Sequence, residues 1–243
     1  MTHPIYAVGD IHGQAEQLRH ALDCIRADGG ADAPIVFLGD YIDRGPDSKD
    51  VIAQLVTGAR VNANWIFLKG NHDRMMEWFL HDPPVHDPHL LLGFHWLHDR
   101  IGGRETLASY GLTDTDGRRM FELAAEAREC VPQEHVDFLN DLVLHHRSGS
   151  LFFAHAGIRP GVALDAQDEE DLLWIRDEFH SSSADHGALI VHGHTPVHKA
   201  AHYGNRINLD SGAGYGYPLT VAVFEGTDCW TLGADGRRKA LKP

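Results

Sequence analysis

One short pattern occurs three times in the first part of the chain and restricts the fold more than any other feature. Each copy is an apolar run closed by Gly and then by Asp or Asn. The runs and their ends are residues 4–8 with Gly9-Asp10, 34–38 with Gly39-Asp40, and 65–68 with Gly70-Asn71. Segments with apolar residues at helical spacing lie between them, at 14–28 and 48–58. This alternation predicts an α/β fold with parallel strands joined by right-handed crossovers.

The rest of the chain changes character twice. Prolines interrupt residues 80–140, and helical patterns follow there at 94–97, 119–128 and 133–142. We therefore expect a mostly helical insertion, or cap, over 80–140 within a single domain spanning residues 1–243. Beyond it we expect a hairpin whose strands flank the turn 148–150, a helix at 168–179, and strands at 188–191, 205–209 and 219–224. The predicted architecture is two packed sheets with helices outside.

The charge balance excludes several classes of partner. Lys and Arg number 21 and Asp and Glu 35, for a formal net charge of −14. Such an acidic chain does not suit a phosphate backbone, so we expect no nucleic-acid partner. No apolar run approaches the roughly 18 residues of a membrane span, so we expect no membrane partner. The 3 cysteines are too few for a disulfide framework, and we expect a soluble cytoplasmic protein.

Five polar blocks follow predicted strands and share one design, a tight Gly turn that carries potential ligands. They are residues 9–13, 39–45, 70–73, 155–157 and 192–196. Ligands bind at the carboxyl ends of strands in open α/β sheets, so Asp10, Asp40 and Asn71 are expected to converge. Asp10 and His12 point the same way in an extended segment and can bind the same ion. Carboxylate, imidazole and amide ligands suit Mn, Fe or Zn.

These five blocks, in this order and spacing, resemble the calcineurin-like metallophosphoesterases, and most closely the bacterial phosphoprotein phosphatase (PPP) branch. The resemblance covers nearly the whole chain and implies a two-sheet metallophosphoesterase sandwich flanked by helices. It implies two divalent metal ions, with Mn²⁺ expected first and Fe or Zn as alternatives. By resemblance the first metal is bound by Asp10, His12 and Asp40. The second is bound by Asp40, Asn71, His155 and His194, so Asp40 bridges both.

The resemblance also assigns the residues that act on substrate. His72 matches the family's catalytic histidine, which protonates the leaving oxygen, and Asp43 matches the carboxylate that orients it. Arg44 matches a phosphate-binding arginine. Arg176, in Leu-Leu-Trp-Ile-Arg, resembles the second such arginine, although a helix-face salt bridge is the alternative interpretation. Charge supports these roles, because two divalent ions and two carboxylates leave a net positive site that suits a phosphate dianion.

Other polar residues receive plainer interpretations. The chain has 19 His, and we interpret His192 as a structural neighbour and Asp73 as a helix N-terminal residue. Tyr215 and Tyr217 are predicted either to line the cleft or to form a plain turn. Pro196 stands where the wider superfamily often has another metal-binding His, which favours the phosphatase branch. The histidines of the insertion are interpreted as loop or cap residues: His81, His86, His89, His95 and His98.

Three functions are compared on these residues. The favoured one is a serine/threonine protein phosphatase that hydrolyses phosphoprotein or phosphopeptide monoesters by attack of a dimetal-bridging hydroxide. The alternative is a symmetrical dinucleoside-polyphosphate (diadenosine tetraphosphate) hydrolase, which would use the same metals. A catalytically inactive binding scaffold is disfavoured, because His72, Asp43 and every ligand position are intact. The sequence leaves the oligomeric state and the physiological substrate open.

Overall fold

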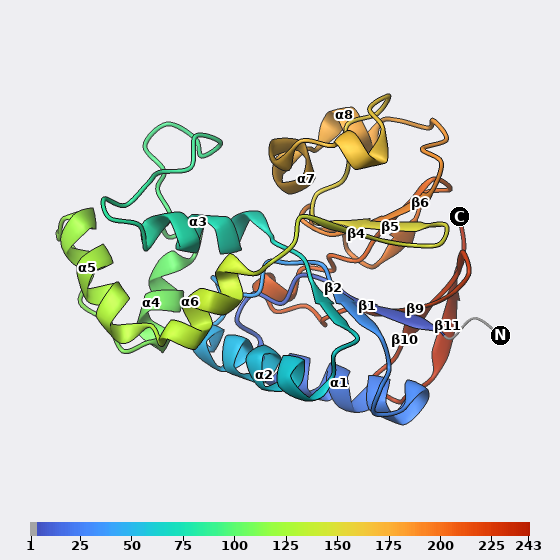
Figure 1. Ribbon diagram of the computed structural model, residues 1–243, viewed down its shortest axis with the longest axis horizontal. Coiled ribbons are helices and arrows are strands. Elements are labelled where there is room, and N and C mark those ends of the chain that lie inside the picture. The colour runs from blue at the N-terminus through green and yellow to red at the C-terminus, as the bar shows by residue number, and fades with distance from the viewer. Residues whose placement is uncertain (1–3) are drawn as a thin grey trace.

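The computed structural model describes residues 4–243 as two β-sheets packed face to face, with helices on their outer sides (Figure 1). The first sheet has six strands in the order β11-β10-β9-β1-β2-β3 and the second five in the order β4-β5-β6-β8-β7. The first sheet comprises β1 (Ile5–Val8), β2 (Ile35–Phe37), β3 (Trp65–Phe67), β9 (Val221–Glu225), β10 (Asp228–Leu232) and β11 (Arg238–Leu241). The second comprises β4 (His145–Ser148), β5 (Leu151–Ala154), β6 (Leu189–His192), β7 (Ala201–His202) and β8 (Arg206–Asn208).

The three N-terminal strands are parallel neighbours, as the sequence predicts. Tyr6 pairs with Ile35 and Ile35 with Trp65, so the carboxyl ends of β1, β2 and β3 lie along one edge. Strands β9, β10 and β11 extend the sheet on the other side of β1 in antiparallel fashion. The sequence analysis did not anticipate β10 and β11, because β11 is a partly exposed edge strand without an apolar run.

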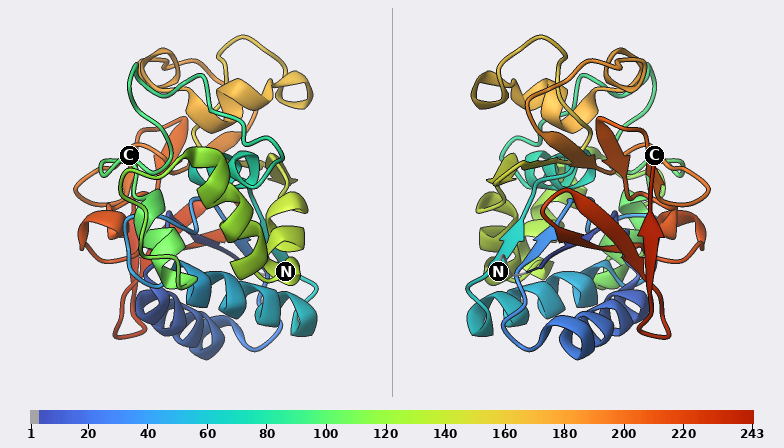
Figure 2. Two further views of the ribbon diagram at one scale, coloured as in Figure 1. Left: turned by 90° about the vertical axis from the view of Figure 1, so that its left-hand side faces the viewer. Right: turned by 90° about the vertical axis from the view of Figure 1, so that its right-hand side faces the viewer.

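Alternating side chains of the first sheet face two different cores. Tyr6 and Val8 of β1 pack with the helices α1 (Ala15–Gly29) and α2 (Ser48–Val61) on the outer face. Ala7 and its counterpart Val36 point the other way and pack with Phe153 and Val191 of the second sheet. Figure 2 shows α1 and α2 side by side beneath the first sheet. Because successive side chains of a strand point to opposite faces, one core lies between the two sheets and the other lies between the first sheet and its helices.

The second sheet includes the expected hairpin of β4 and β5, followed by parallel pairing of β5, β6 and β8. Its outer face is covered by two short helices, α7 (Glu169–Trp174) and α8 (Asp177–His180). The expected single helix over 168–179 is therefore wrong. The chain leaves helical geometry at two residues: ψ of Ile175 is 142°, and φ of Arg176 is −134°.

The insertion contains α4 (Gly103–Ser109), α5 (Met120–Cys130) and α6 (Gln133–Asn140), after α3 (Asn71–Phe79). The helices expected at 119–128 and 133–142 are confirmed with small shifts, whereas the one expected at 94–97 is wrong. Residues 94–97, downstream of three prolines, are irregular at 94–95 and form a turn at 96–97, and α4 was not predicted. Its apolar residues join the core under the first sheet, so it packs as a continuation of that core; the single-domain boundary of 1–243 stays a prediction.

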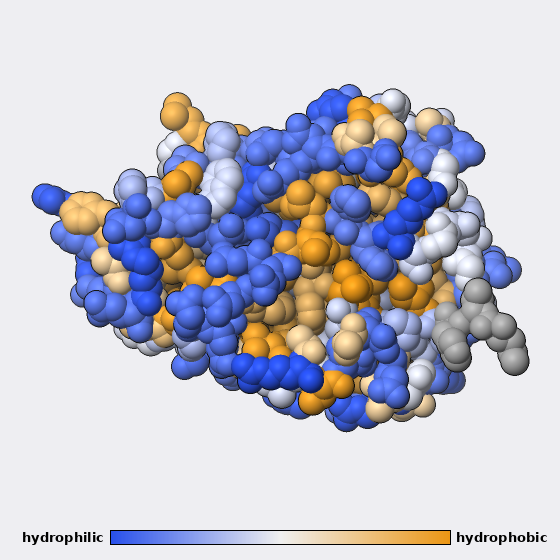
Figure 3. Space-filling view, viewed as in Figure 1, coloured by the Kyte–Doolittle hydropathy of each residue, from blue (hydrophilic) through white to orange (hydrophobic). Residues whose placement is uncertain are grey.

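Two 3₁₀ helices, η1 (Leu164–Ala166) and η2 (Ala213–Tyr215), complete the elements. The face shown in Figure 3 is hydrophilic around its rim, with hydrophobic residues visible across its centre. Among the helices of residues 4–243, none has both the length and the apolar character that crossing a bilayer requires.

Candidate metal and phosphate site

Backbone strain in this molecule is concentrated at the strand ends. Within residues 4–243, the non-glycine residues with positive φ all belong to the predicted site: His12, Asp40, Asp43, Arg44 and His194. Their φ values lie between 47° and 72°, a region that is costly for residues with a Cβ. Strain of this kind persists where the surrounding structure fixes a functional side chain, so the backbone itself marks the site.

Close packing brings the blocks together. A Cβ added to Gly193 would lie 1.9 Å from Asp10 Oδ1, and one added to Gly70 would lie 2.1 Å from Asp40 Oδ1. The fifth block therefore contacts the first, and the third contacts the second. Glycine is required at both positions because no side chain fits beside these carboxylates.

Two groups of buried side chains have the geometry to hold a metal ion. His12, Asp40 and His72 each offer one ligand atom within 4.8 Å of the others, and so do Asp40, His155 and His194. Asp40 belongs to both groups, with Oδ2 3.5 Å from His12 Nε2 and Oδ1 3.4 Å from His155 Nε2. This is the position that a carboxylate shared between two ions would occupy.

The histidines present acceptor atoms to the site. His12 Nδ1 donates to the carbonyl of Ile42 at 2.8 Å, and His155 Nδ1 donates to the carbonyl of Leu38 at 2.8 Å. These bonds leave the Nε2 lone pairs directed inward. His155 Nε2 then lies 3.0 Å from Asn71 Oδ1, and both atoms are acceptors. Two acceptors that face each other in this way fit a cation bound between His155 and Asn71, which supports an expected metal ion there.

Asn71 and Asp10 complete the predicted ligand set in different ways. Asn71 Oδ1 also lies 2.8 Å from His194 Nδ1, so Asn71 joins the group of His155 and His194. Asp10 belongs to neither three-residue group, and its Oδ2 accepts a hydrogen bond from the His194 backbone at 2.9 Å. Asp10 Oδ1 and His194 Nε2 are buried with no hydrogen-bond partner. Both unpartnered atoms belong to residues of the predicted ligand set, as expected of atoms that would bind a metal ion.

Electrostatics keep the ligands in metal-binding protonation states. Burial would raise the pKa of Asp40, but the positive charge that the surrounding histidines carry when protonated, His155 first, lowers that pKa far below its ordinary value. Burial lowers the pKa values of His12, His155 and His194, so these imidazoles stay neutral at physiological pH. A neutral imidazole and an ionised carboxylate are the forms that bind a metal.

His72 is held by a carboxylate that is completely buried. His72 Nδ1 donates to Asp43 Oδ2 at 2.6 Å, as the family resemblance implied. The same oxygen accepts a hydrogen bond from Trp96 Nε1 at 2.9 Å, and Asp43 Oδ1 accepts one from Thr106 Oγ1 at 2.7 Å. Sequence reasoning missed Trp96 and Thr106, because both lie in the insertion and in no motif. The insertion thus helps to build the site.

The two predicted phosphate-binding arginines differ in their surroundings. Arg44 donates to His12 Nε2 at 2.5 Å and to His72 Nε2 at 3.0 Å, and its guanidinium lies 4.8 Å from the Tyr215 ring centre. Arg176 donates to Thr195 Oγ1 at 3.2 Å, and burial lowers its pKa. In residues 4–243 Arg176 forms no ion pair, so the salt-bridge interpretation has no partner there.

Residues given structural interpretations take structural positions. The Asp73 carboxylate accepts hydrogen bonds from the backbone N–H groups of Gly70 and Asp40, each at 2.8 Å, and joins two strand ends. His192 Nε2 accepts from Arg206 Nη1 at 3.2 Å and belongs to neither metal-binding group. Of the histidines in the insertion, none lies in these groups.

Asp210 is a buried site neighbour that sequence reasoning did not select. It is 1% exposed, its Oδ1 accepts from the Gly212 backbone at 2.9 Å, and its Oδ2 has no partner. Burial raises the pKa of Asp210 to about 6. The signal was present, because Asp210 follows the predicted strand 205–209 and precedes a Gly-rich turn, as in the other blocks.

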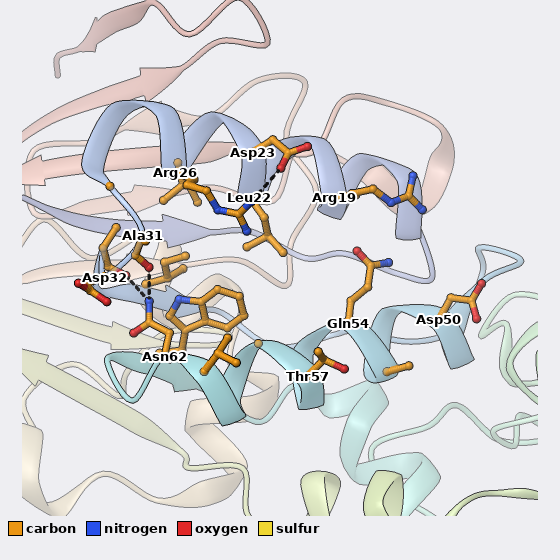
Figure 4. A pocket seen from close by; sticks show the side chains of 18 residues that line it. Arg19, Leu22, Asp23, Arg26, Ala31, Asp32, Asp50, Gln54, Thr57 and Asn62 are labelled. Atoms are coloured by element: carbon orange, nitrogen blue, oxygen red, sulfur yellow. Dashed lines mark hydrogen bonds and ion pairs between the residues drawn. The ribbon is translucent and has the colours of Figure 1, made fainter.

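Several grooves lie outside this cluster. One, of about 800 Å³, runs between α1 and α2 at the end where β2 and β3 begin, and none of the predicted site residues lines it (Figure 4). Gln54 and Thr57 border it on α2, and Arg19 and Arg26 on α1. Another, of about 1020 Å³, adjoins the site through the loop that carries Tyr217.

Comparison with known proteins identifies the class. Residues 3–223 match the family described as calcineurin-like phosphoesterase, and the chain belongs to that family. It is a metallophosphoesterase, a hydrolase of a family that uses two metal ions, and the buried groups around Asp40 are its candidate metal-binding residues.

The chain is similar to relatives with two kinds of name. It is 28% identical over 231 residues to serine/threonine-protein phosphatase 1 of Salmonella typhimurium, covering 91% of this chain and 92% of the relative. It is 26% identical over 241 residues to PrpE of Oceanobacillus iheyensis, named an asymmetrical bis(5'-nucleosyl)-tetraphosphatase, covering 89% and 87%. PrpE of Bacillus subtilis has the same name and is 27% identical over 206 residues, covering 78% and 75%.

Solved structures confirm the α/β fold with two sheets. A point mutant of a cold-active protein tyrosine phosphatase superposes with a TM-score of 0.63 at 18% identity, covering 100% of this chain and 81% of that one. The enzyme from a psychrophilic Shewanella species gives a TM-score of 0.60 at 16% identity, covering 100% and 81%.

Proposed function

We propose that this protein is a serine/threonine protein phosphatase that removes phosphate from phosphoserine and phosphothreonine in phosphoproteins. The buried pair of His72 and Asp43 beside Asp40 carries the proposal. A serine or threonine alkoxide is a poor leaving group and needs a proton, whereas phosphoanhydride and aryl leaving groups need one less. A proton donor held this firmly is most useful for an alkyl phosphate ester.

The proposed metal centre uses the residues assigned from the sequence. Asp10, His12 and Asp40 would hold one divalent ion, and Asp40, Asn71, His155 and His194 the other. Mn²⁺ is the first choice, with Fe or Zn as alternatives. When bound, such a pair of ions supplies a hydroxide nucleophile at neutral pH and neutralises charge on the phosphoryl group.

The chain's own side chains supply the rest of the chemistry. Arg44 and Arg176 would bind phosphate oxygens, since a guanidinium matches them with paired donors. His72 Nε2 lies 4.0 Å from Asp40 Oδ2 and accepts a hydrogen bond from Arg44, so it would first take up a proton and then deliver it to the leaving oxygen. Asp43 holds Nδ1, which keeps the ring in the orientation that this transfer needs.

The test compares leaving groups in the variant His72→Asn. We expect kcat on a phosphoserine peptide to fall by about 10³-fold, within the range of general acid catalysis, and kcat on 4-nitrophenyl phosphate to fall much less. His81→Asn is the matched control, because His81 is exposed and outside the site. Equal losses on the two substrates would contradict the assigned role of His72.

A second candidate is an asymmetrical dinucleoside-tetraphosphate hydrolase, a name carried by several relatives. The sequence analysis considered the symmetrical enzyme instead, so this alternative is revised. The groove next to the site favours a long substrate, because Tyr217, Lys199 and Lys239 line it with an aromatic ring and two cations. Diadenosine tetraphosphate would be cleaved to ATP and AMP by the asymmetrical route and to ADP alone by the symmetrical one. A higher kcat/KM on this compound than on phosphopeptide would replace the first proposal.

The partner follows from the same proposal. A phosphoprotein or phosphopeptide is the proposed partner, and nucleic acid and membranes are not. The cytoplasmic location inferred from composition stays a prediction.

A further inference from the structure

The turn after β8 packs directly against the first polar block. A Cβ added to Gly9 would lie 2.5 Å from the carbonyl oxygen of Leu209, so the backbones leading into Asp10 and Asp210 are in contact. A Cβ added to Gly214 would lie 2.8 Å from the His12 ring. The loop that begins at Asp210 therefore wraps around the residues proposed to hold the first metal ion.

In both Asp10 and Asp210, one carboxylate oxygen accepts a hydrogen bond and the other accepts none. The satisfied oxygens accept backbone N–H groups of His194 and Gly212, both at 2.9 Å. The others, Asp10 Oδ1 and Asp210 Oδ2, are buried with no partner. The two residues are only 2% and 1% exposed, so bulk solvent does not reach these oxygens. Two such buried carboxylates close to Asp40 are unfavourable without a cation between them.

In residues 4–243 neither carboxylate forms an ion pair with Lys, Arg or His. The Arg44 guanidinium, which lies in the site, donates to His12 and His72 instead. The two unsatisfied oxygens therefore have either a shared proton or a bound metal ion available to them. A shared proton would be independent of metal, whereas a bound metal ion would make Asp210 part of the metal centre.

We propose that Asp210 is a further metal-site residue, whose free Oδ2 supports the cation at the Asp10 and His12 position through one water molecule, since Asp210 lies in neither group of residues that could bind one ion directly. This inference rests on the proposed metal centre but not on the identity of the substrate. With Asp210 included, three carboxylates face two divalent ions. The added carboxylate selects for a tightly bound divalent ion on this side of Asp40.

The test measures metal binding without any substrate. Wild type, Asp210→Asn, Asp210→Ala and the control Asp165→Asn are stripped of metal and titrated with Mn²⁺, and bound manganese per chain is measured. Asp165 is exposed and remote from the site in sequence. We expect both Asp210 variants to bind one of the two ions at least about tenfold more weakly, as residues that support a metal site do. Unchanged affinity for both ions would overturn the proposal.

Thermal unfolding separates a metal role from a structural one. Metal-free Asp210→Asn should melt above the metal-free wild type, because a buried charge is removed from a group of like charges, yet gain less from Mn²⁺. A lower melting temperature without metal, combined with a full gain from Mn²⁺, would make Asp210 a structural residue and refute the inference. Failure of the phosphatase proposal alone would appear only in the substrate assays and leave these binding results unchanged.

Discussion

The strand ends hold the candidate metal ligands, whereas the insertion holds the residues that fix the orienting carboxylate of His72. At the strand ends, short blocks converge on Asp40 from both sheets, with strained backbone at His12, Asp40 and His194. In the insertion, Trp96 and Thr106 donate to Asp43 from an ordinary apolar core. This difference shows that one site can combine metal ligands positioned by local turns with a proton donor, His72, whose orienting carboxylate is positioned by tertiary packing.

The largest effect is expected at the strand ends, from Asp40→Asn. This change removes the carboxylate common to both candidate groups, so we expect loss of both ions and a fall in kcat of at least about 10³-fold. Bound manganese and turnover of 4-nitrophenyl phosphate measure the two effects. Retention of both ions would show that Asp40 is not shared.

A smaller loss, concentrated in kcat, is expected from Asp43→Asn. The amide keeps the shape but no longer holds His72 in one tautomer, so kcat on a phosphoserine peptide should fall by roughly 10²-fold with KM little changed. Metal content should match wild type, which distinguishes this variant from Asp40→Asn. Loss of metal here would mean that the two regions do not have separate roles.

Changes in the insertion itself should have moderate effects. Trp96→Phe and Thr106→Val each leave a fully buried Asp43 oxygen with one donor fewer, which costs about 1–3 kcal/mol in the free energy of unfolding. We expect kcat on phosphoserine peptide to fall about tenfold in each, without change in manganese binding. If kcat were unchanged in both variants, the insertion would have a structural role only and would not position His72.

The smallest effect concerns the pH dependence of stability and comes from His192, the first residue of the fifth block. Burial lowers the pKa of His192 well below 6.5, so the folded protein keeps it neutral while the unfolded chain binds a proton. The contribution of His192 to the free energy of unfolding is therefore fully present above the unfolded pKa of 6.5. It is lost as the pH falls below 6.5, by up to about 1.4 kcal/mol per pH unit. His192→Gln should be less stable near neutral pH, yet lose less on acidification, as urea unfolding at several pH values would show. An unchanged slope would contradict this interpretation.

The site was more predictable than the segment that supports it, for physical reasons. Metal ligands require particular side chains at turns after strands, so Asp10, Asp40 and His194 stand out in the sequence. Trp96 looks like a core residue, and its indole N–H finds Asp43 only because residues far apart in sequence fold together. The break at Arg176 was missed as well, since helical periodicity continues through it.

The most direct test of the central claim is a crystal structure of the protein soaked with Mn²⁺, with anomalous scattering used to locate the ions. The account predicts two manganese peaks about 3.5–4 Å apart, with the carboxylate of Asp40 bound to both. A single peak, or two peaks of which only one contacts Asp40, would contradict it.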